Sequence, residues 1–181
     1  AVNAGKCVDT SMGFTPLEGV IMGSRCGAVD PAIIPFLMEK ENIPASEMCN
    51  WMNKKCGFLG VSGVSSDLRQ VCAAAGEGNE RARLSINILA YQVRKYIGSY
   101  TAAMNGLDCL VFTAGIGENN AMIRRLSCEN MSFFGIEIDN AKNEAKDPFE
   151  IHSANSRVKI LVIPTNEELV IARDTLSIIN G

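Results

Sequence analysis

The hydrophobic and polar positions of the chain fall into helix-like and strand-like patterns. The longest helical pattern runs over residues 79–104, where apolar side chains recur at every third or fourth position. Continuous apolar runs at 107–113 and 157–163 predict strands, and each is followed by a predicted helix, over 119–131 and 167–178. Strands that alternate with helices predict an α/β layer architecture.

The first half of the chain is predicted to be mainly helical after a short hairpin in residues 1–11. Pro just inside a helix start, and Ser before one, mark the expected helix beginnings. These signals predict helices that begin at Thr15–Glu18, at Asp30–Pro31 and after an N-cap at Ser65, and a helix over 44–55. A flexible crossing is predicted at Gly57–Gly63. A further short strand is predicted at 136–138.

Composition limits the function classes. With 181 residues, 47% of them apolar and 20% charged, the chain fits one domain with a real core. A net charge of −3 without a basic stripe argues against nucleic-acid binding, and no apolar run reaches membrane-spanning length. The start at Ala1 carries no signal-peptide pattern and no initiator Met, so we expect the chain to begin partway through a longer protein.

The seven cysteines include no Cys-x-x-Cys pair, and His152 is the only histidine. A zinc site or a disulfide framework is therefore not expected. A reducing cytoplasm is the simplest setting for a protein of this composition.

One run of residues, Phe112–Asn120, carries candidate chemistry. It follows the strand at 107–113, and its glycines, Gly115 and Gly117, come where the chain turns toward a helix. Backbone N–H groups without intervening side chains suit a phosphate or another polar part of a nucleotide. Glycines at such a turn also occur for packing alone. The third position of a dinucleotide fingerprint holds Asn120, which favours a nucleotide over NAD.

Four segments together resemble the carboxyl-terminal half of the acetate kinase family, over essentially the whole chain. They are Val8–Gly19 with Met22–Gly27, then Ser62–Arg69, then Phe112–Asn119, and last Val162–Leu169. The resemblance implies a ribonuclease-H-like α/β domain of the actin, sugar kinase and heat-shock ATPase superfamily, with a mixed sheet and flanking helices. It implies that residues 1–181 are the single carboxyl-terminal nucleotide-binding domain of a two-domain kinase.

The resemblance also implies an activity, reversible Mg²⁺-dependent phosphoryl transfer from ATP to acetate that gives acetyl phosphate and ADP, usually in a homodimer. Acetate, ATP and the amino-terminal half of the same enzyme are the expected partners. Residue by residue, it assigns a catalytic role to Arg25, nucleotide contacts to Asp67, Leu68, Arg69, Gly115, Ile116, Gly117, Glu118 and Asn119, and a Mg²⁺-associated role to Glu167.

Several residues of these segments also fit a structural role. Arg25 fits a surface ion pair, and Asp67 fits the start of a helix, where its charge complements the dipole. The pattern Thr165-Asn-Glu-Glu168 is typical of a capping box, so we assign Glu168 to capping and Glu167 to the metal. His152 matches no family position and is interpreted as a solvated loop residue.

The family's phosphate loop and its amino-terminal acetate, Mg²⁺ and phosphoryl-binding residues do not occur in this sequence. The resemblance therefore implies that the chain provides one wall of the cleft, and we expect it to be inactive by itself, because phosphoryl transfer depends on positioning both substrates. A propionate or butyrate kinase half, and a non-catalytic nucleotide-binding or dimerisation module, are the alternatives.

Overall fold

The computed structural model describes residues 1–180, which fall into two compact units, residues 1–106 and residues 107 onward. Both contain helices, and each contains a small two-stranded sheet. The predicted α/β class is therefore confirmed. Among residues 1–180, no helix is both long and apolar enough to cross a membrane.

The first unit opens with the predicted hairpin, β1 (Val2–Asn3) paired antiparallel with β2 (Lys6–Cys7). Its turn places Ala4 and Gly5 in the left-handed region, at φ of 48° and 77°, as a two-residue hairpin turn requires. The helix predicted from Thr15 is wrong, because residues 15–20 form turns and bends in which the Thr15 hydroxyl accepts from the Leu17 N–H.

Three helices follow: α1 (Ile33–Lys40), α2 (Ala45–Lys54) and α3 (Gly57–Ser62). The flexible crossing predicted at 57–63 is wrong, since α3 is an ordered helix whose Phe58 side chain is only 1% exposed. The main-chain N–H groups of Phe58 and Leu59 donate to the carbonyls of Met22 and Gly23, each at 2.9 Å. The loop before α1 thus supplies the acceptors that the start of α3 needs.

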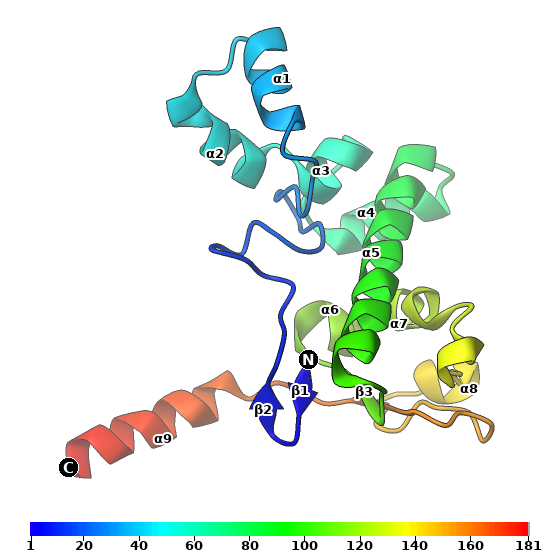
Figure 1. Cartoon of the computed structure of the whole chain (residues 1–181). Helices are drawn as coiled ribbons and strands as arrows, with labels where there is room; N and C mark the ends of the chain where they lie inside the picture. Colours follow the sequence, from blue (N-terminus) through cyan, green and yellow to red (C-terminus); the bar gives the residue numbers. More distant parts are fainter. Residues whose placement is uncertain (181) are drawn as a thin grey trace. The chain divides into compact units, whose positions relative to one another are not determined.

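The core of this unit lies where α3 and α4 (Leu68–Gly76) pack against α5 (Glu80–Met104), the longest helix in Figure 1. The α5 residues Ala82, Ile86, Leu89 and Ile97 are buried there, as the helical spacing predicts. The N-cap of α4 is Asp67 rather than Ser65, whose hydroxyl accepts instead from the Asp67 N–H.

The second unit is built around two parallel strands, β3 (Cys109–Phe112) and β4 (Lys159–Val162). Their register pairs Phe112 with Val162, so both strands end at the same edge of the sheet. From that edge the chain enters α6 (Ala114–Asn119) and α7 (Ala121–Cys128) after β3, and α9 (Glu167–Asn180) after β4. The glycine turn predicted at 113–119 is thus itself a short helix.

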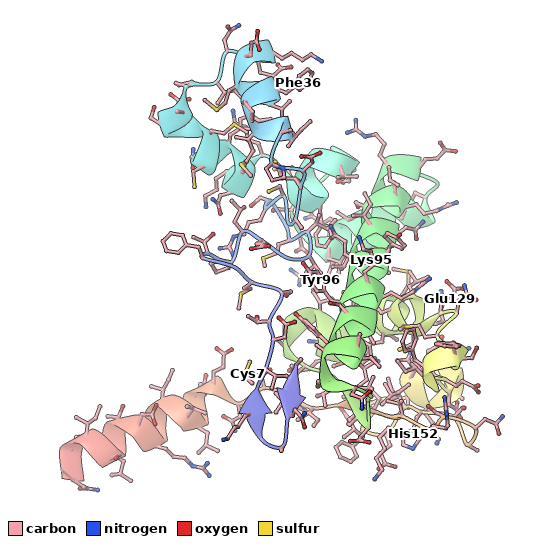
Figure 2. All side chains as sticks on the ribbon, viewed as in Figure 1. Cys7, Phe36, Lys95, Tyr96, Glu129 and His152 are labelled. Carbon is pink, nitrogen blue, oxygen red and sulfur yellow. The ribbon has the colours of Figure 1, made fainter. Side chains whose placement is uncertain are left out.

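Residues 129–158 form a short 3-10 helix at Ser132–Phe134, the helix α8 (Asn140–Asn143) and connecting loops. The strand predicted at 136–138 is reduced to one isolated bridge between Ile138 and His152. His152, labelled in Figure 2, is half-buried, and its ring Nδ1 accepts from the Ile160 N–H at 3.4 Å. It is a structural residue of this region rather than a solvated loop residue.

Candidate functional site

Arg25 lies in a loop that backbone hydrogen bonds hold at several points. Within the loop, the Met22 N–H donates to the Arg25 carbonyl at 3.2 Å. The Cys26 N–H donates to Met52 at the end of α2 at 3.1 Å, and the Cys56 N–H donates to Ser24 at 3.0 Å. Because the residues on both sides of Arg25 are tied to α2 and the start of α3, the backbone of this arginine is fixed.

Gly57 lets the start of α3 approach this loop closely. Its φ is +60°, and a Cβ at this position would overlap the Met22 carbonyl oxygen and lie 2.8 Å from the Arg25 carbonyl oxygen. Only glycine meets both conditions without moving the backbone of the Arg25 loop.

The Arg25 side chain has no carboxylate partner among residues 1–180. Arg25 is half-buried as a residue, and its Nη1 donates a weak hydrogen bond to the Met22 sulfur at 3.5 Å. The surface ion pair that the sequence also allowed for Arg25 is not formed within the described part of the chain. A fixed backbone with an uncommitted guanidinium suits a group that binds an anion from outside the unit.

The Asp67–Arg69 segment forms its own ion pair at the start of α4. The Asp67 carboxylate accepts from the Arg69 N–H at 2.9 Å and from the Arg69 guanidinium at 2.6 Å. The Arg69 side chain beside it holds the pKa of the Asp67 carboxyl below its usual range. The Arg69 side chain is 90% exposed, whereas Leu68 is buried in the core and offers no side chain to a ligand.

The structure brings the Arg25 loop and the Asp67 segment into contact. A Cβ on Gly23 would lie 2.7 Å from the carbonyl oxygen of Ser66, so the two backbones touch directly. Arg25 lies two residues after Gly23, and Asp67 lies one residue after Ser66. The helix α3 lies between the two segments in sequence, and its start is hydrogen-bonded to the Arg25 loop.

In the second unit, Thr165 holds the start of the Gly115–Asn119 segment. Its hydroxyl accepts from the Ala114 N–H at 3.0 Å and lies 2.9 Å from the Thr113 hydroxyl. Its own N–H donates to a Glu118 carboxylate oxygen at 2.7 Å. These bonds tie the segment after β3 to the segment after β4, as expected for two parallel strands that end at one edge.

The Thr165 and Glu118 contact corrects the predicted capping box. A capping box would have Glu168 accept from the Thr165 N–H, but Glu118 takes that donor. The N-cap of α9 is Asn166, whose side-chain oxygen accepts from the Leu169 N–H at 3.0 Å. Glu168 is thereby left without the structural role assigned to it.

The two glycines of the segment differ in what they face. A Cβ on Gly117 would lie 3.2 Å from the backbone of Phe112, which is tighter than ordinary packing. A Cβ on Gly115 would meet no atom within 4 Å. Packing within the chain therefore explains Gly117 but leaves Gly115 open to a ligand that approaches the backbone.

Glu167 stands in the first turn of α9, two residues after Thr165. Its side chain is exposed, and no described residue pairs with its carboxylate. Residues 1–180 contain no cluster of three metal-binding side chains. A single exposed carboxylate of this kind fits Mg²⁺, which is bound in kinases through one or two carboxylates together with substrate phosphates.

Two residues that the sequence did not single out support the Gly115–Asn119 segment. Arg124 on α7 donates to the carbonyls of Gly117 and Glu118, and Asn143 on α8 accepts from Arg124. A pocket of about 510 Å³ lies beside them, lined in part by Glu118, Arg124 and Phe149. An arginine inside an apolar helical pattern was the signal that could have identified Arg124.

The sequence profile of the acetokinase family matches residues 1–173. The chain belongs to the acetokinase family. It is 58% identical to an acetate kinase of Acetivibrio thermocellus, over all of this chain and 46% of that protein. This member of the acetokinase family thus spans about half the length of the curated relatives it matches.

Solved structures show the same relation. The crystal structure of Porphyromonas gingivalis acetate kinase matches with a TM-score of 0.93 and 47% identity, over 98% of this chain and 45% of that one. A propionate kinase from Francisella tularensis matches with a TM-score of 0.89 and 43% identity, over 96% of this chain and 44% of that one. The acetokinase-family chain therefore has the fold of the acetate and propionate kinases, as the sequence predicts.

Proposed function

We propose that this chain is the nucleotide-binding, carboxyl-terminal half of a cytoplasmic acetate kinase. In the proposed reaction, a carboxylate oxygen of acetate attacks the γ-phosphorus of ATP. A new O–P bond forms, the bond between the γ-phosphorus and the β,γ-bridging oxygen breaks, and ADP leaves with that oxygen. The reverse reaction makes ATP from acetyl phosphate and ADP.

Arg25 is the proposed catalytic residue. Charge spreads over the equatorial oxygens of the transferring phosphoryl group, and a guanidinium held in place stabilises that charge. The fixed backbone of the loop and the absence of a carboxylate partner among the described residues support this role. This combination of a fixed backbone and a guanidinium without a carboxylate partner is the observation that carries the proposal.

Asp67, Leu68 and Arg69 are proposed nucleotide-contacting residues, and so are Gly115, Ile116, Gly117, Glu118 and Asn119. The contacts of Leu68 and Gly117 would be made by backbone atoms, since packing occupies the Leu68 side chain and the space beside Gly117. The open space at Gly115 and the 40% exposed side chain of Ile116 support a contact with the nucleoside.

Glu167 is the proposed Mg²⁺-associated residue, acting directly or through a water molecule. Mg²⁺, when bound, would neutralise the charge that builds on the β- and γ-phosphate oxygens. Glu168 is the second candidate, because Glu118 and Asn166 leave it free of a capping role.

The amino-terminal half of the same enzyme is the proposed partner, and the complete enzyme is proposed to be a homodimer. The helix α9 supports a partner, because its apolar side chains are between 42% and 81% exposed. Exposed apolar surface of this extent is typical of an interaction face. These side chains belong to Leu169, Val170, Ile171, Leu176, Ile178 and Ile179.

The test is an acceptor series with the complete two-half enzyme. Acetyl phosphate, propionyl phosphate and butyryl phosphate are measured as hydroxamates, with ATP as donor. The highest kcat/KM with acetate supports an acetate kinase. A preference for propionate would favour the half of a propionate kinase, an alternative that the similarity to the Francisella propionate kinase supports. If phosphoryl transfer occurs to none of the three acids, the remaining candidate is a non-catalytic nucleotide-binding or dimerisation module.

A further inference from the structure

Arg124 is a buried arginine, and no carboxylate among residues 1–180 pairs with it. Its side chain is 2% exposed, and it lies on α7, directly after the proposed nucleotide segment. Nη1 donates to the carbonyls of Gly117 at 2.9 Å and Glu118 at 2.8 Å. Nε donates to the Asn143 side-chain oxygen and Nη2 to the Asn143 carbonyl, each at 2.7 Å. One guanidinium thus joins α6 to α8.

The acceptors on α6 explain how this charge is tolerated. Gly117 and Glu118 lie in the last turn of α6, where carbonyls have no partner within the helix and carry partial negative charge. The neighbouring carbonyls are also satisfied, Gly115 by the Asn119 side chain and Ile116 by the Asn120 N–H. Burial lowers the pKa of the Arg124 guanidinium, so the charge is costly, and the Gly117 and Glu118 carbonyls stabilise it together with the two Asn143 oxygens.

The segment is therefore fixed from both ends. Thr165 holds its start through the Ala114 N–H, and Arg124 holds its end through two carbonyls. Between these two anchors lies the open position at Gly115. A helix of six residues with two glycines would not keep its shape by propensity, because glycine disfavours helix and short helices are marginal.

We propose that Arg124, oriented by Asn143, is a positioning residue for the nucleotide: it holds the α6 backbone in the conformation that the nucleotide contacts. The inference rests on the proposed function for its ligand. Arg124 acts through the Gly117 and Glu118 carbonyls and does not itself contact the reacting atoms. Asn143 orients the guanidinium from the far side, and its own amide donates to the Ala121 carbonyl at 2.9 Å.

The experiment compares Arg124→Lys and Arg124→Gln in the complete enzyme. A lysine ammonium cannot reproduce the planar set of donors, and glutamine removes the charge. We expect the KM for ATP to rise by about tenfold or more in Arg124→Gln and less in Arg124→Lys, while the KM for acetate changes by less than about twofold. Hydrogen exchange should quicken at residues 115–119 and remain unchanged in β3 and β4.

Arg125→Gln is the matched control. Arg125 is the next residue on α7, and no described residue bonds its guanidinium to α6, so its KM for ATP should match the wild type. Two results for Arg124→Gln would overturn the proposal: equal changes in the KM for ATP and the KM for acetate, or faster hydrogen exchange throughout the second unit. Either result would show that Arg124 only supports the core.

If Arg124→Gln does not fold, Asn143→Ala decides. This variant keeps Arg124 and removes the side-chain acceptor of its Nε, together with the amide that donates to the Ala121 carbonyl. A rise of about threefold in the KM for ATP is expected, and an unchanged value overturns the proposal. A wild-type enzyme that transfers no phosphoryl group would instead overturn the proposed function. The exchange result at residues 115–119 would still test the role of Arg124 in holding α6.

Discussion

The Thr165 main-chain N–H donates to the Glu118 carboxylate at 2.7 Å, and the Thr165 hydroxyl lies 3.0 Å from the same oxygen. This contact joins the last turn of α6 to the segment that leads into α9, across 47 residues of sequence. The proposed nucleotide segment and the proposed Mg²⁺-associated glutamate thus share one support.

The contact predicts a pH dependence of stability. Hydrogen bonds from the Thr165 backbone and side chain hold the pKa of the Glu118 carboxyl below its usual range. A group with a depressed folded-state pKa stabilises the fold above its unfolded value, about 4.3 for glutamate, and this stabilisation is lost as the pH falls through the folded value. Glu118→Gln should therefore be less stable than wild type at pH 7, and the difference should shrink below about pH 4.

Urea unfolding at a series of pH values measures this. Glu144→Gln, whose carboxylate makes no hydrogen bond with a described residue, is the control. A Glu118→Gln variant whose stability difference does not vary with pH would contradict the role given to the carboxylate.

The two glycines of α6 predict opposite outcomes for the same substitution. Gly115→Ala adds a methyl group in open space within a helix, so stability should stay equal or rise by about 0.5–1 kcal/mol, while nucleotide affinity falls. Gly117→Ala presses a methyl group against the Phe112 backbone, so stability should fall. Thermal unfolding and ADP titration of both variants measure this. Unchanged ADP affinity in Gly115→Ala would remove this position from the nucleotide site.

Arg25→Ala should lower kcat far more than it lowers ATP affinity, because the guanidinium is proposed to act on the transferring phosphoryl group. Removal of one hydrogen-bond donor that stabilises charge in the transition state typically costs about 10²-fold to 10³-fold in kcat. Steady-state kinetics of the complete enzyme measure it, with Arg83→Ala on α5 as a control arginine. A near-normal kcat in Arg25→Ala would defeat the assignment.

Glu167→Gln and Glu168→Gln separate the two candidate metal residues. The variant that removes the Mg²⁺-associated carboxylate should need a higher Mg²⁺ concentration for half-maximal activity, and the other should follow the wild-type Mg²⁺ curve. Unfolding of both variants without Mg²⁺ is the matched measurement, since neither carboxylate supports the fold in the described residues. Identical Mg²⁺ curves for both variants and wild type would exclude both residues.

Periodicity predicted the parts of the fold that depend on local sequence. The α5 helix and the β3 and β4 strands carry long apolar patterns, and all three are present at the predicted places. Parallel pairing of β3 and β4 then placed the candidate residues Gly115 and Glu167 after strand ends at one edge. This much follows from alternation of strands and helices.

The parts that the sequence did not predict depend on distant partners. The segments at α3 and α6 are rich in glycine, which locally favours a turn, but Met22 and Gly23 supply acceptors to the start of α3, and Thr165 and Arg124 satisfy the ends of α6. Glu168 fits a local capping box, in which it would accept from the Thr165 N–H. That N–H donates instead to Glu118, which is 47 residues away in the sequence. The roles of Arg25, Asp67 and Glu167 in catalysis or binding stay predictions.

The most direct test measures acetyl phosphate formation by this chain alone and by the same chain joined to the amino-terminal half of its own protein. Both are assayed with ATP, Mg²⁺ and acetate, and the Arg25→Ala version of the joined enzyme is included. We predict no significant turnover by the chain alone, robust turnover by the joined enzyme, and a large loss in Arg25→Ala. Robust turnover by the chain alone, or none by the joined enzyme, would contradict the proposal that this chain is one half of an acetate kinase.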